Sequence, residues 1–222
     1  MPGTQAYRFL IADDHPLFRD ALRLTMSVRH PDAPIVEAGT FTGVMERLAD
    51  DDDIDLILLD LTMPGMHGLA GLVFLRNQHP GVPIVVVSAS EDAATIRQAL
   101  RYGVSGYIPN SLATEMIGEA IEAVLQGGLW VPPGIEPAGR DELHPAAARI
   151  QSLTPQQLRV LMMLSDGMLN KQIAHALDVS EATVKAHVSA ILQKLGVDSR
   201  TQAVIAASHL EAGRPQPALS GD

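Results

Sequence analysis

Three carboxylates at the ends of two apolar runs are the residues of this chain best suited to chemistry. Residues 7–12 form one run, which stops at Asp13 and Asp14, and residues 54–59 form another, which stops at Asp60. Each run has the length of a strand and precedes an amphipathic helical pattern, so both are predicted βα units of a parallel sheet. The carboxyl ends of parallel strands share one edge. If the first and third strands are neighbours, the three acids converge there, and their like charges require a cation.

These acids predict a particular chemistry once a cation is present. Mg²⁺ prefers carboxylate oxygens and keeps positions open for water and phosphate oxygens. A carboxylate beside such a metal can form an acyl phosphate, which makes Asp60 a candidate nucleophile. The alternative is that each acid only caps the helix that follows it. Ser88, which ends a later apolar run, and the sequence LDLTMPG over residues 59–65 favour the phosphoryl site.

The elements that must position these acids are five strand-like runs that alternate with helical patterns, at residues 7–12, 34–38, 54–59, 82–87 and 105–108. This alternation predicts a doubly wound α/β domain with a five-stranded parallel sheet in flavodoxin-like order. A stretch rich in glycine and proline then indicates a linker, and the sequence after it is helical. The predicted organisation is a first domain at 1–127, a linker at 128–150, an all-α domain at 151–211 and a frayed tail at 212–222.

Composition limits the classes of protein that fit. The chain has 222 residues, of which 46% are hydrophobic, so it can bury a sizeable core. It has no apolar run of the ~18 residues that a membrane span needs and no signal-peptide pattern, so we expect a cytoplasmic protein without membrane association. The absence of cysteine excludes disulfides and thiol catalysis. The first domain contains the histidines His15, His30, His67 and His79, and these are not spaced like the ligands of a metal ion.

The first domain resembles the receiver domain of bacterial response regulators. The motifs that carry the resemblance are IADDHP at 11–16, LLDLTMPG at 58–65 and GVSGY at 103–107. The resemblance implies that Asp60 accepts a phosphoryl group from a sensor histidine kinase. It also implies that Mg²⁺ is held by three carboxylates and one backbone carbonyl, those of Asp13, Asp14, Asp60 and Thr62.

Two further positions follow from the same resemblance, and a third departs from it. Ser88 would contact the phosphoryl oxygens, and Tyr107 would swing inward when Ser88 moves. The family places a lysine after the fifth strand, where this chain has Asn110. An amide donates a neutral hydrogen bond, roughly half as strong as a charge-assisted one. We therefore expect weaker stabilisation of the phosphoryl group, and the alternative is a receiver that signals without phosphate.

The all-α domain begins with a recognisable helix start. Thr154 can cap the helix, and Gln157 completes a capping box with it. That helix is predicted to end before Gly167, and a short helix over residues 171–177 follows. Ser180 then caps a third helix at 181–195, and the tight turn between the last two helices predicts a helix-turn-helix. The second member of this motif would lie in a DNA major groove.

The third helix separates apolar from polar positions. Five aliphatic residues recur at helical spacing and are predicted to be buried: Val184, Val188, Ile191, Leu192 and Leu195. The residues predicted to contact DNA bases or phosphates are Lys171, Thr183, Lys185, Ala186, Ser189, Lys194 and Arg200. The alternative is an ordinary helical bundle. Residues 151–222 have no net charge, whereas residues 1–150 carry a net charge of −10, so the predicted electrostatic attraction to DNA is small.

Residues 151–208 resemble the LuxR-type DNA-binding domain. The matching sequences are LTP at 153–155, NKQIA at 170–174, TVKAHV at 183–188 and KLGV at 194–197. A receiver followed by this domain is the layout of the NarL/FixJ class, which implies a sequence-specific transcription factor that binds double-stranded DNA as a homodimer. By the same resemblance, residues 197–207 form the dimerisation helix. We hypothesise that the inactive receiver packs against or shields the recognition helix.

The sequence leaves one enzymatic reading to be weighed. A small phosphatase would also use an aspartate nucleophile and Mg²⁺. It would need a second acid two residues after Asp60, and Thr62 occupies that position. We therefore predict that the chain is a regulator and not an enzyme.

Overall fold

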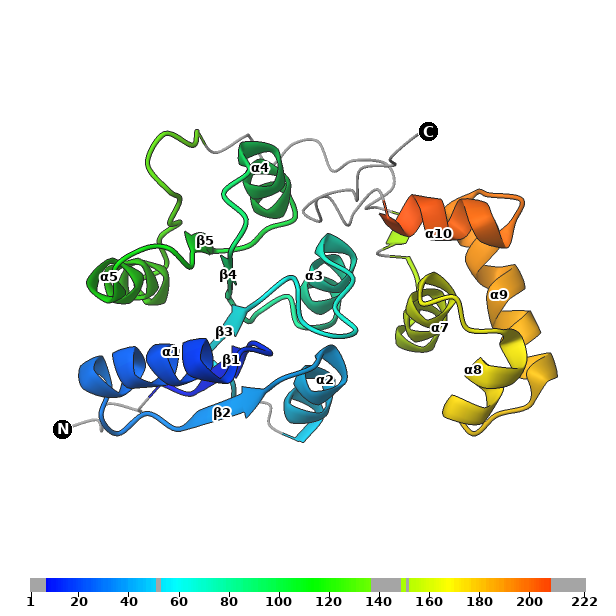
Figure 1. The fold of residues 1–222 in the computed structure, drawn as a ribbon, viewed down its shortest axis with the longest axis horizontal. Helices are drawn as coiled ribbons and strands as arrows, with labels where there is room; N and C mark the ends of the chain where they lie inside the picture. Colours follow the sequence, from blue (N-terminus) through cyan, green and yellow to red (C-terminus); the bar gives the residue numbers. More distant parts are fainter. Residues whose placement is uncertain (1–6, 51–52, 137–148, 151, 209–222) are drawn as a thin grey trace, which may run out of the picture.

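The computed structural model describes residues 7–50, 53–136, 149–150 and 152–208. The predicted tail at 212–222 and most of the predicted linker, residues 137–148, lie outside the described residues. The two groups of elements are an α/β unit and a unit of helices only (Figure 1). No helix in the described part of the chain is both long enough and apolar enough to cross a membrane.

The first unit contains the predicted parallel sheet. Its strands are β1 Phe9–Ala12, β2 Ile35–Ala38, β3 Leu56–Leu59, β4 Ile84–Ser88 and β5 Gly106–Pro109. All pairs are parallel, and the order is β2-β1-β3-β4-β5, which confirms the flavodoxin-like prediction. All five strands begin one or two residues later than predicted. Since β1 and β3 are neighbours and Ala12 is level with Leu59, the acids that follow these strands meet at one edge.

Helices cover both faces of the sheet. They are α1 Pro16–Arg29, α2 Phe41–Asp50, α3 Leu69–Gln78, α4 Ala93–Arg101 and α5 Thr114–Leu125. Alternate strand residues point to opposite faces, so Phe9 and Ile11 pack with α1 and α5, and Leu10 packs in the other cluster. Burial on both faces explains why the strands are continuous apolar runs rather than alternating ones.

The chain returns to the sheet after α5. The Tyr107 N–H donates to the Trp130 carbonyl at 3.2 Å, and the Trp130 N–H donates to the Ser105 carbonyl at 3.1 Å. The first residues of the predicted linker therefore run along the edge of β5.

Within the described residues, the second unit contains four helices: α7 Pro155–Ser165, α8 Asn170–Ala176, α9 Glu181–Leu195 and α10 Arg200–Ser208. The predicted capping box at Thr154 and Gln157 is present, and the Ser180 hydroxyl accepts from the Thr183 N–H at 3.1 Å. Helix α9 has the predicted bounds and ends at Gly196, whose φ of 66° lies in the left-handed region that glycine adopts without strain. The α10 helix begins three residues after the predicted start.

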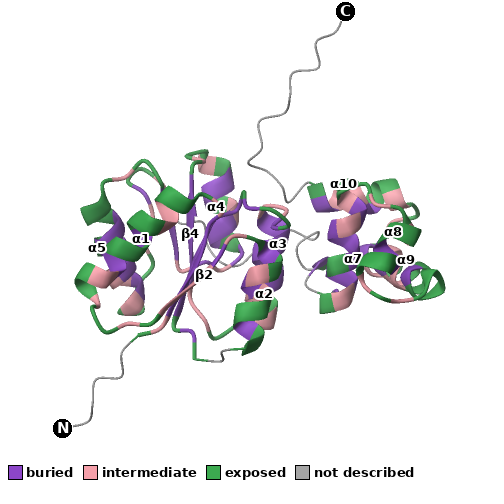
Figure 2. Cartoon of the chain, turned by 60° about the horizontal axis from the view of Figure 1, so that its bottom comes forward, coloured by how far each residue is buried: buried purple, intermediate pink, exposed green. Residues whose placement is uncertain are grey.

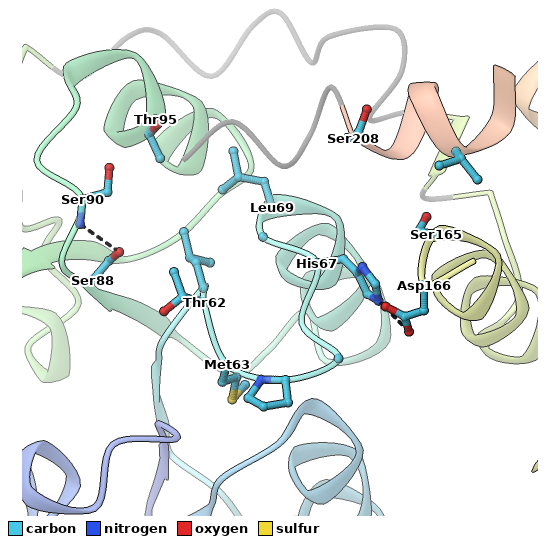
Figure 3. Close-up of a pocket in the computed structure, with 15 residues that line it drawn as sticks. Thr62, Met63, His67, Leu69, Ser88, Ser90, Thr95, Ser165, Asp166 and Ser208 are labelled. Atoms are coloured by element: carbon cyan, nitrogen blue, oxygen red, sulfur yellow. Dashed lines mark hydrogen bonds and ion pairs between the residues drawn. The ribbon is translucent and has the colours of Figure 1, made fainter. Parts of the chain in front are cut away.

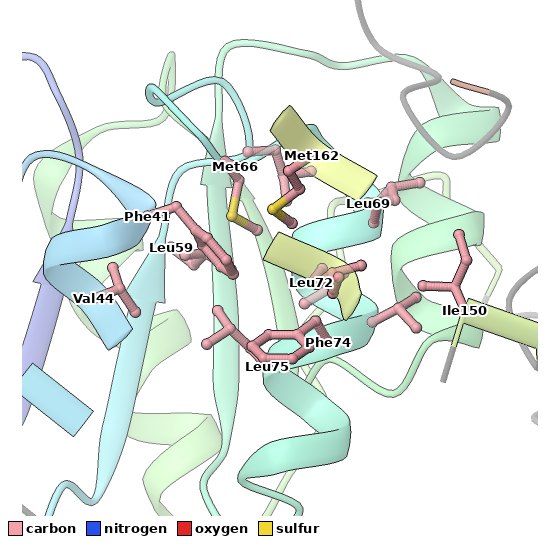
Figure 4. Packing of buried hydrophobic residues seen from close by; sticks show 14 of the residues in the cluster. Phe41, Val44, Leu59, Met66, Leu69, Leu72, Phe74, Leu75, Ile150 and Met162 are labelled. Carbon is pink, nitrogen blue, oxygen red and sulfur yellow. The ribbon is translucent and has the colours of Figure 1, made fainter. Parts of the chain in front are cut away.

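Buried side chains form a continuous contact between the two units. One hydrophobic cluster contains residues of the α/β unit, such as Met66 and Phe74, together with Ile150 and Met162 of the helical part (Figure 4). Met162 is 7% exposed. The two domains are therefore packed against each other in this structure rather than separated by solvent.

Candidate phosphoacceptor and DNA-binding sites

The acids after β1 and β3 form one cluster. The ligand atoms of Asp13, Asp14, His15 and Asp60 all lie within 4.8 Å of one another. The Asp13 carboxylate accepts a hydrogen bond from the His15 N–H at 2.6 Å. The Asp60 carboxylate accepts from Thr62 twice, from its N–H at 3.1 Å and from its hydroxyl at 2.7 Å. The sequence analysis did not assign His15 to the cluster, although it directly follows Asp13 and Asp14, because its ring reaches Asp14 Oδ1 only through the conformation of this loop.

Burial and like charge make this cluster electrostatically unfavourable. Asp13 and Asp60 are each 4% exposed. Burial raises the pKa of both carboxyls above the ordinary value, and neighbouring carboxylates raise it further. The hydrogen bonds from His15 and Thr62 act in the opposite direction. The cluster is thus suited to a group that brings positive charge.

The donor set fits a hard divalent cation. It offers carboxylate oxygens, with no thiolate in the chain, and Mg²⁺ prefers such oxygen ligands. Among the described residues, Asp14 Oδ1 is buried and makes no hydrogen bond, although His15 Nδ1 lies 2.8 Å from it. A buried carboxylate oxygen of this kind is costly in the absence of a cation.

Ser88 and Tyr107 lie beside this edge on β4 and β5. Ser88 is 3% exposed, and its hydroxyl accepts from the Ser90 N–H at 3.2 Å. Tyr107 is fully buried and donates its hydroxyl to the Ser90 carbonyl at 2.8 Å. Burial raises the pKa of Tyr107, so it remains a neutral donor at physiological pH. The two predicted switch residues thus share one partner, the loop that follows β4.

Asn110 occupies the position after β5. Its N–H donates to the Ser88 carbonyl at 2.9 Å, and its side chain is exposed. The backbone therefore places this residue next to the end of β4. The side chain that extends from it is a neutral amide, and residues 1–150 contain no lysine.

A cavity of about 190 Å³ connects the sheet edge that carries the acid cluster with the helical domain. Thr62 and Ser88 line it on the receiver side, and Asp166 and Ser208 line it on the side of α7 and α10 (Figure 3). His67 projects between the domains, and its Nε2 lies 3.7 Å from Asp166 Oδ2. The sequence offered no signal for this contact, because it depends on how the two domains are placed.

The loop after β3 carries this histidine in an uncommon backbone conformation. His67 has a φ of 51°, which is rare for a residue with a side chain. Gly65 and Gly68 on either side also have positive φ. The chain thus turns sharply at His67, on the side of the loop that faces α7. A second cavity of about 150 Å³ is lined by Phe41, Phe74 and residues of α7, and His67 lines this cavity as well.

Helix α9 has the predicted two faces. Val184, Ile191 and Leu195 are buried, whereas Val188 and Leu192 are only partly buried, which corrects the prediction for those two. They lie at the margin of the core rather than inside it.

The polar face of α9 is exposed. Lys185, Ala186 and Ser189 are exposed side by side at helical spacing. The Lys185 ammonium lies 3.0 Å from the Glu181 carboxylate, an exposed pair that water and salt screen. Thr183, near the start of α9, and Lys171, on α8, are also exposed.

The two remaining predicted DNA contacts are engaged inside the domain. Lys194 donates to the Ser152 carbonyl at 2.6 Å and to Gln157 Oε1 at 2.8 Å. Arg200 donates to the Met168 carbonyl. Both cations therefore join α9 and α10 to the segments around α7, which the sequence did not predict.

The structure does not show the hypothesised shielding of α9. The receiver lies against α7 and α10, and α9 lies on the far side of the helical domain in both views (Figures 1 and 2). The apolar surface of α7 favours this arrangement, since Met162 and Leu158 are buried in the cluster that both domains share, whereas the polar face of α9 is exposed.

Comparison with known families agrees with this geometry. Residues 9–122 match the model described as response regulator receiver domain. Residues 151–207 match the model described as bacterial regulatory proteins, luxR family. The receiver match alone covers more than half of the chain.

Relatives and solved structures align along nearly the full length. The chain is 44% identical to the glycerol metabolism activator of Pseudomonas putida, over 92% of this chain and 96% of that protein. It is 32% identical to the nitrate/nitrite response regulator protein NarL of Escherichia coli K12, again over 92% and 96%. A structure of two RcsB dimers bound to two parallel DNAs is similar in fold, with a TM-score of 0.55, 21% identity and coverage of 93% and 98%. The chain belongs to the bacterial response regulators that join a receiver domain to a LuxR-type DNA-binding domain, and it is a transcription regulator, not an enzyme.

Proposed function

We propose that Asp60 is phosphorylated by a sensor histidine kinase and that this modification controls dimerisation and DNA binding. The observation that carries the proposal is the buried carboxylate cluster at the carboxyl ends of β1 and β3. Asp60 would attack the phosphorus of the donor, and the phosphoryl group would become an acyl phosphate while the donor group leaves. Bound Mg²⁺ would supply positive charge to the attacking carboxylate and to the incoming phosphoryl oxygens.

The other residues of the edge have separate proposed roles. Asp13 and Asp14 would hold Mg²⁺ together with Asp60 and the Thr62 carbonyl. Ser88 donates its hydroxyl to a phosphoryl oxygen, which requires that it turn away from the Ser90 N–H. Tyr107 and the loop after β4 respond because they are hydrogen-bonded to each other. Loss of that arrangement changes the cavity that Thr62, Ser88, Asp166 and Ser208 line together.

The helical domain is the part of the chain that is proposed to bind DNA. We propose that two copies bind double-stranded DNA, with Lys185, Ala186 and Ser189 of α9 at the bases and Lys171 and Thr183 at the backbone. The exposure of this face supports the assignment. A phosphate role for Lys194 or Arg200 would require each to leave its carbonyl partner.

The proposed domain organisation follows the sequence. The receiver covers 1–127, the linker 128–150 and the DNA-binding domain 151–211. Because the target is chromosomal DNA, we place the protein in the cytoplasm.

The test is the intact mass of the full chain after incubation with Mg²⁺ and acetyl phosphate. One added phosphoryl group is expected in the wild type and none in Asp60→Asn. Asp32→Asn, which removes an exposed acid elsewhere in the receiver, is the matched control and should be phosphorylated like the wild type. An adduct that persists in Asp60→Asn would contradict the choice of nucleophile.

A second candidate is a receiver that regulates transcription without phosphate. The neutral, exposed Asn110 side chain favours it, since the phosphoryl group would lack a cationic partner there. Absence of an adduct from acetyl phosphate and from purified kinases, together with DNA binding by the unmodified chain, would select this candidate.

A further inference from the structure

The cavity of about 150 Å³ between the two domains has an apolar interior. Phe41 of α2, Phe74 of α3, and Leu158 and Met162 of α7 line it, and all four are buried. Three of them, Phe41, Phe74 and Met162, are seen in Figure 4. An apolar cavity of roughly this size stays free of water and accommodates a molecule as large as benzene. The interior is therefore suited to a small apolar group.

The side chains of this interior favour an aromatic ring over an aliphatic chain. The rings of Phe41 and Phe74 meet edge to face, with centroids 6.1 Å apart and an angle of 63° between their planes. Aromatic rings in such contacts gain stability beyond the area that they bury. Met45, Met162 and Met163 also line the cavity, and thioether sulfur makes favourable contacts with aromatic rings. We therefore expect a single aromatic ring to be the best occupant of the interior.

Positive charge is available on the solvent side of the cavity. Arg159 and Asp166 line it there, and both are exposed. Asp166 Oδ2 already lies 3.7 Å from His67 Nε2, whereas no described residue forms a hydrogen bond or ion pair with the Arg159 guanidinium. Phe41 and Thr42, the first two residues of α2, also line the cavity, and the start of a helix carries partial positive charge. The solvent side is thus suited to an anionic group.

We propose that this cavity binds a small aromatic carboxylate, with its ring beside Phe41, Phe74 and Met162 and its carboxylate at Arg159. A guanidinium donates two parallel hydrogen bonds to a carboxylate, which fixes the orientation of the ligand. The carboxylate stays at the solvent side, so it loses only part of its hydration on binding. Because α2 and α3 belong to the receiver and α7 to the helical domain, the ligand touches both domains and stabilises their packed arrangement. The regulator would then respond to a metabolite as well as to a phosphoryl group.

The small size of the ligand limits the expected affinity. A substituted benzoate has about ten non-hydrogen atoms, and ligands of this size with one good ion pair bind with a Kd of about 0.1–1 mM. Neither Mg²⁺ nor a phosphoryl group takes part in the proposed contact. Binding is therefore measured without them, and its failure is distinguishable from failure of the proposed phosphorylation.

A fluorine NMR titration of the full chain with 4-fluorobenzoate tests the proposal. The wild type is expected to bind with a Kd in the range given above. Arg159→Gln should raise this Kd about 10-fold, because a charge-assisted pair is lost, and should leave the binding of 4-fluorobenzyl alcohol unchanged. Arg101→Gln removes an exposed arginine at the end of α4, outside the lining of the cavity, and should bind 4-fluorobenzoate like the wild type.

A second variant tests the interior of the cavity. Met45 is only partly buried, and Met45→Trp places a larger side chain in the space that the ligand ring would occupy, so it should abolish binding. Circular dichroism establishes that this variant is folded. No binding by the wild type at about ten times the expected Kd would overturn the proposal, as would unchanged binding by Arg159→Gln and Met45→Trp. Tighter binding of 4-fluorobenzylamine than of 4-fluorobenzoate would assign the solvent side to Asp166 and overturn the choice of a carboxylate.

Discussion

Replacing Asp13 by asparagine is expected to stabilise the receiver in the absence of divalent cations. Asparagine keeps a side-chain oxygen for the His15 N–H, which donates to Asp13 at 2.6 Å. It removes one negative charge from a cluster in which Asp13 and Asp60 are each 4% exposed. The variant therefore isolates the electrostatic effect from the packing.

The magnitude follows from the separation of the charges. Two unit charges at the 4.8 Å limit of the cluster repel by about 3.5 kcal/mol at an effective dielectric constant of about 20. Proton uptake and small movements of the carboxylates reduce the measured effect. We expect Asp13→Asn to raise the free energy of unfolding by about 2 kcal/mol, which corresponds to about 4–8 °C in Tm for a domain of this size.

Mg²⁺ is expected to reverse the order of stability. At a concentration about 100 times its Kd, a bound ligand stabilises the folded state by about 2.7 kcal/mol. The wild type should gain this amount and Asp13→Asn much less, because a carboxylate ligand is lost. Calorimetry of both chains with and without Mg²⁺ measures the four values, and Asp32→Asn controls for net charge. A lower Tm for Asp13→Asn without Mg²⁺, or equal stabilisation by Mg²⁺, would refute the electrostatic account.

The stability difference between Asp13→Asn and the wild type should change with pH in one direction, which the pKa values of Asp13 and Asp60 determine. The pKa values of Asp13 and Asp60 are raised above 3.8 in the folded state, so the folded receiver takes up protons before the unfolded chain does. Protonation relieves the repulsion. The advantage of Asp13→Asn over the wild type without Mg²⁺ should therefore shrink as the pH falls from 7 through the raised pKa values toward 3.8.

Three further changes test other parts of the molecule. Lys185→Ala should weaken binding to a duplex selected from a random pool by about 1–3 kcal/mol and reduce the salt slope by about one, as measured by fluorescence anisotropy. An unchanged affinity and slope would show that α9 binds through another face. Thr154→Ala should cost the DNA-binding domain about 1 kcal/mol in thermal unfolding, because a capping hydroxyl is lost. A loss near zero would mean that the capping box contributes little. Asn110→Lys should increase the phosphorylated fraction at a fixed acetyl phosphate concentration, because a charge-assisted bond is about twice as strong as a neutral one. Intact mass measures that fraction, and no increase would indicate that the exposed side chain does not reach the phosphoryl group.

Local patterns predicted most of the fold. The apolar runs that become β1 and β3 are buried on both faces, and the hydroxyls of Thr154 and Ser180 begin helices for reasons that act within a few residues. Both ends of α9 were predicted to the residue, because Ser180 and Gly196 are residue types that commonly cap a helix at its start and at its end. The predicted first residues of the strands were less accurate, since hydrogen-bond pairing with the neighbouring strand, and not apolar character, decides where a strand begins.

The sites were predictable only where sequence order fixes position. Asp13 and Asp60 follow strands that lie side by side, so their convergence followed from topology. His15 and His67 escaped prediction because their partners depend on loop conformation and on domain packing. Lys194 was assigned to DNA for its charge alone, and no local pattern reveals that Ser152 and Gln157 lie within its reach.

Lys194 and Arg200 are hydrogen-bonded within the helical domain, and this affects how the protein would find its target sites on DNA. With these two cations held by carbonyl groups and a strongly acidic receiver attached, little positive charge remains to hold the protein on arbitrary sequence. We therefore expect sliding along DNA to be brief and the search to proceed mainly through repeated encounters from solution. We also expect few copies to be held on the bulk of the genome, so that occupancy of the proposed target sites would follow the concentration of dimers closely.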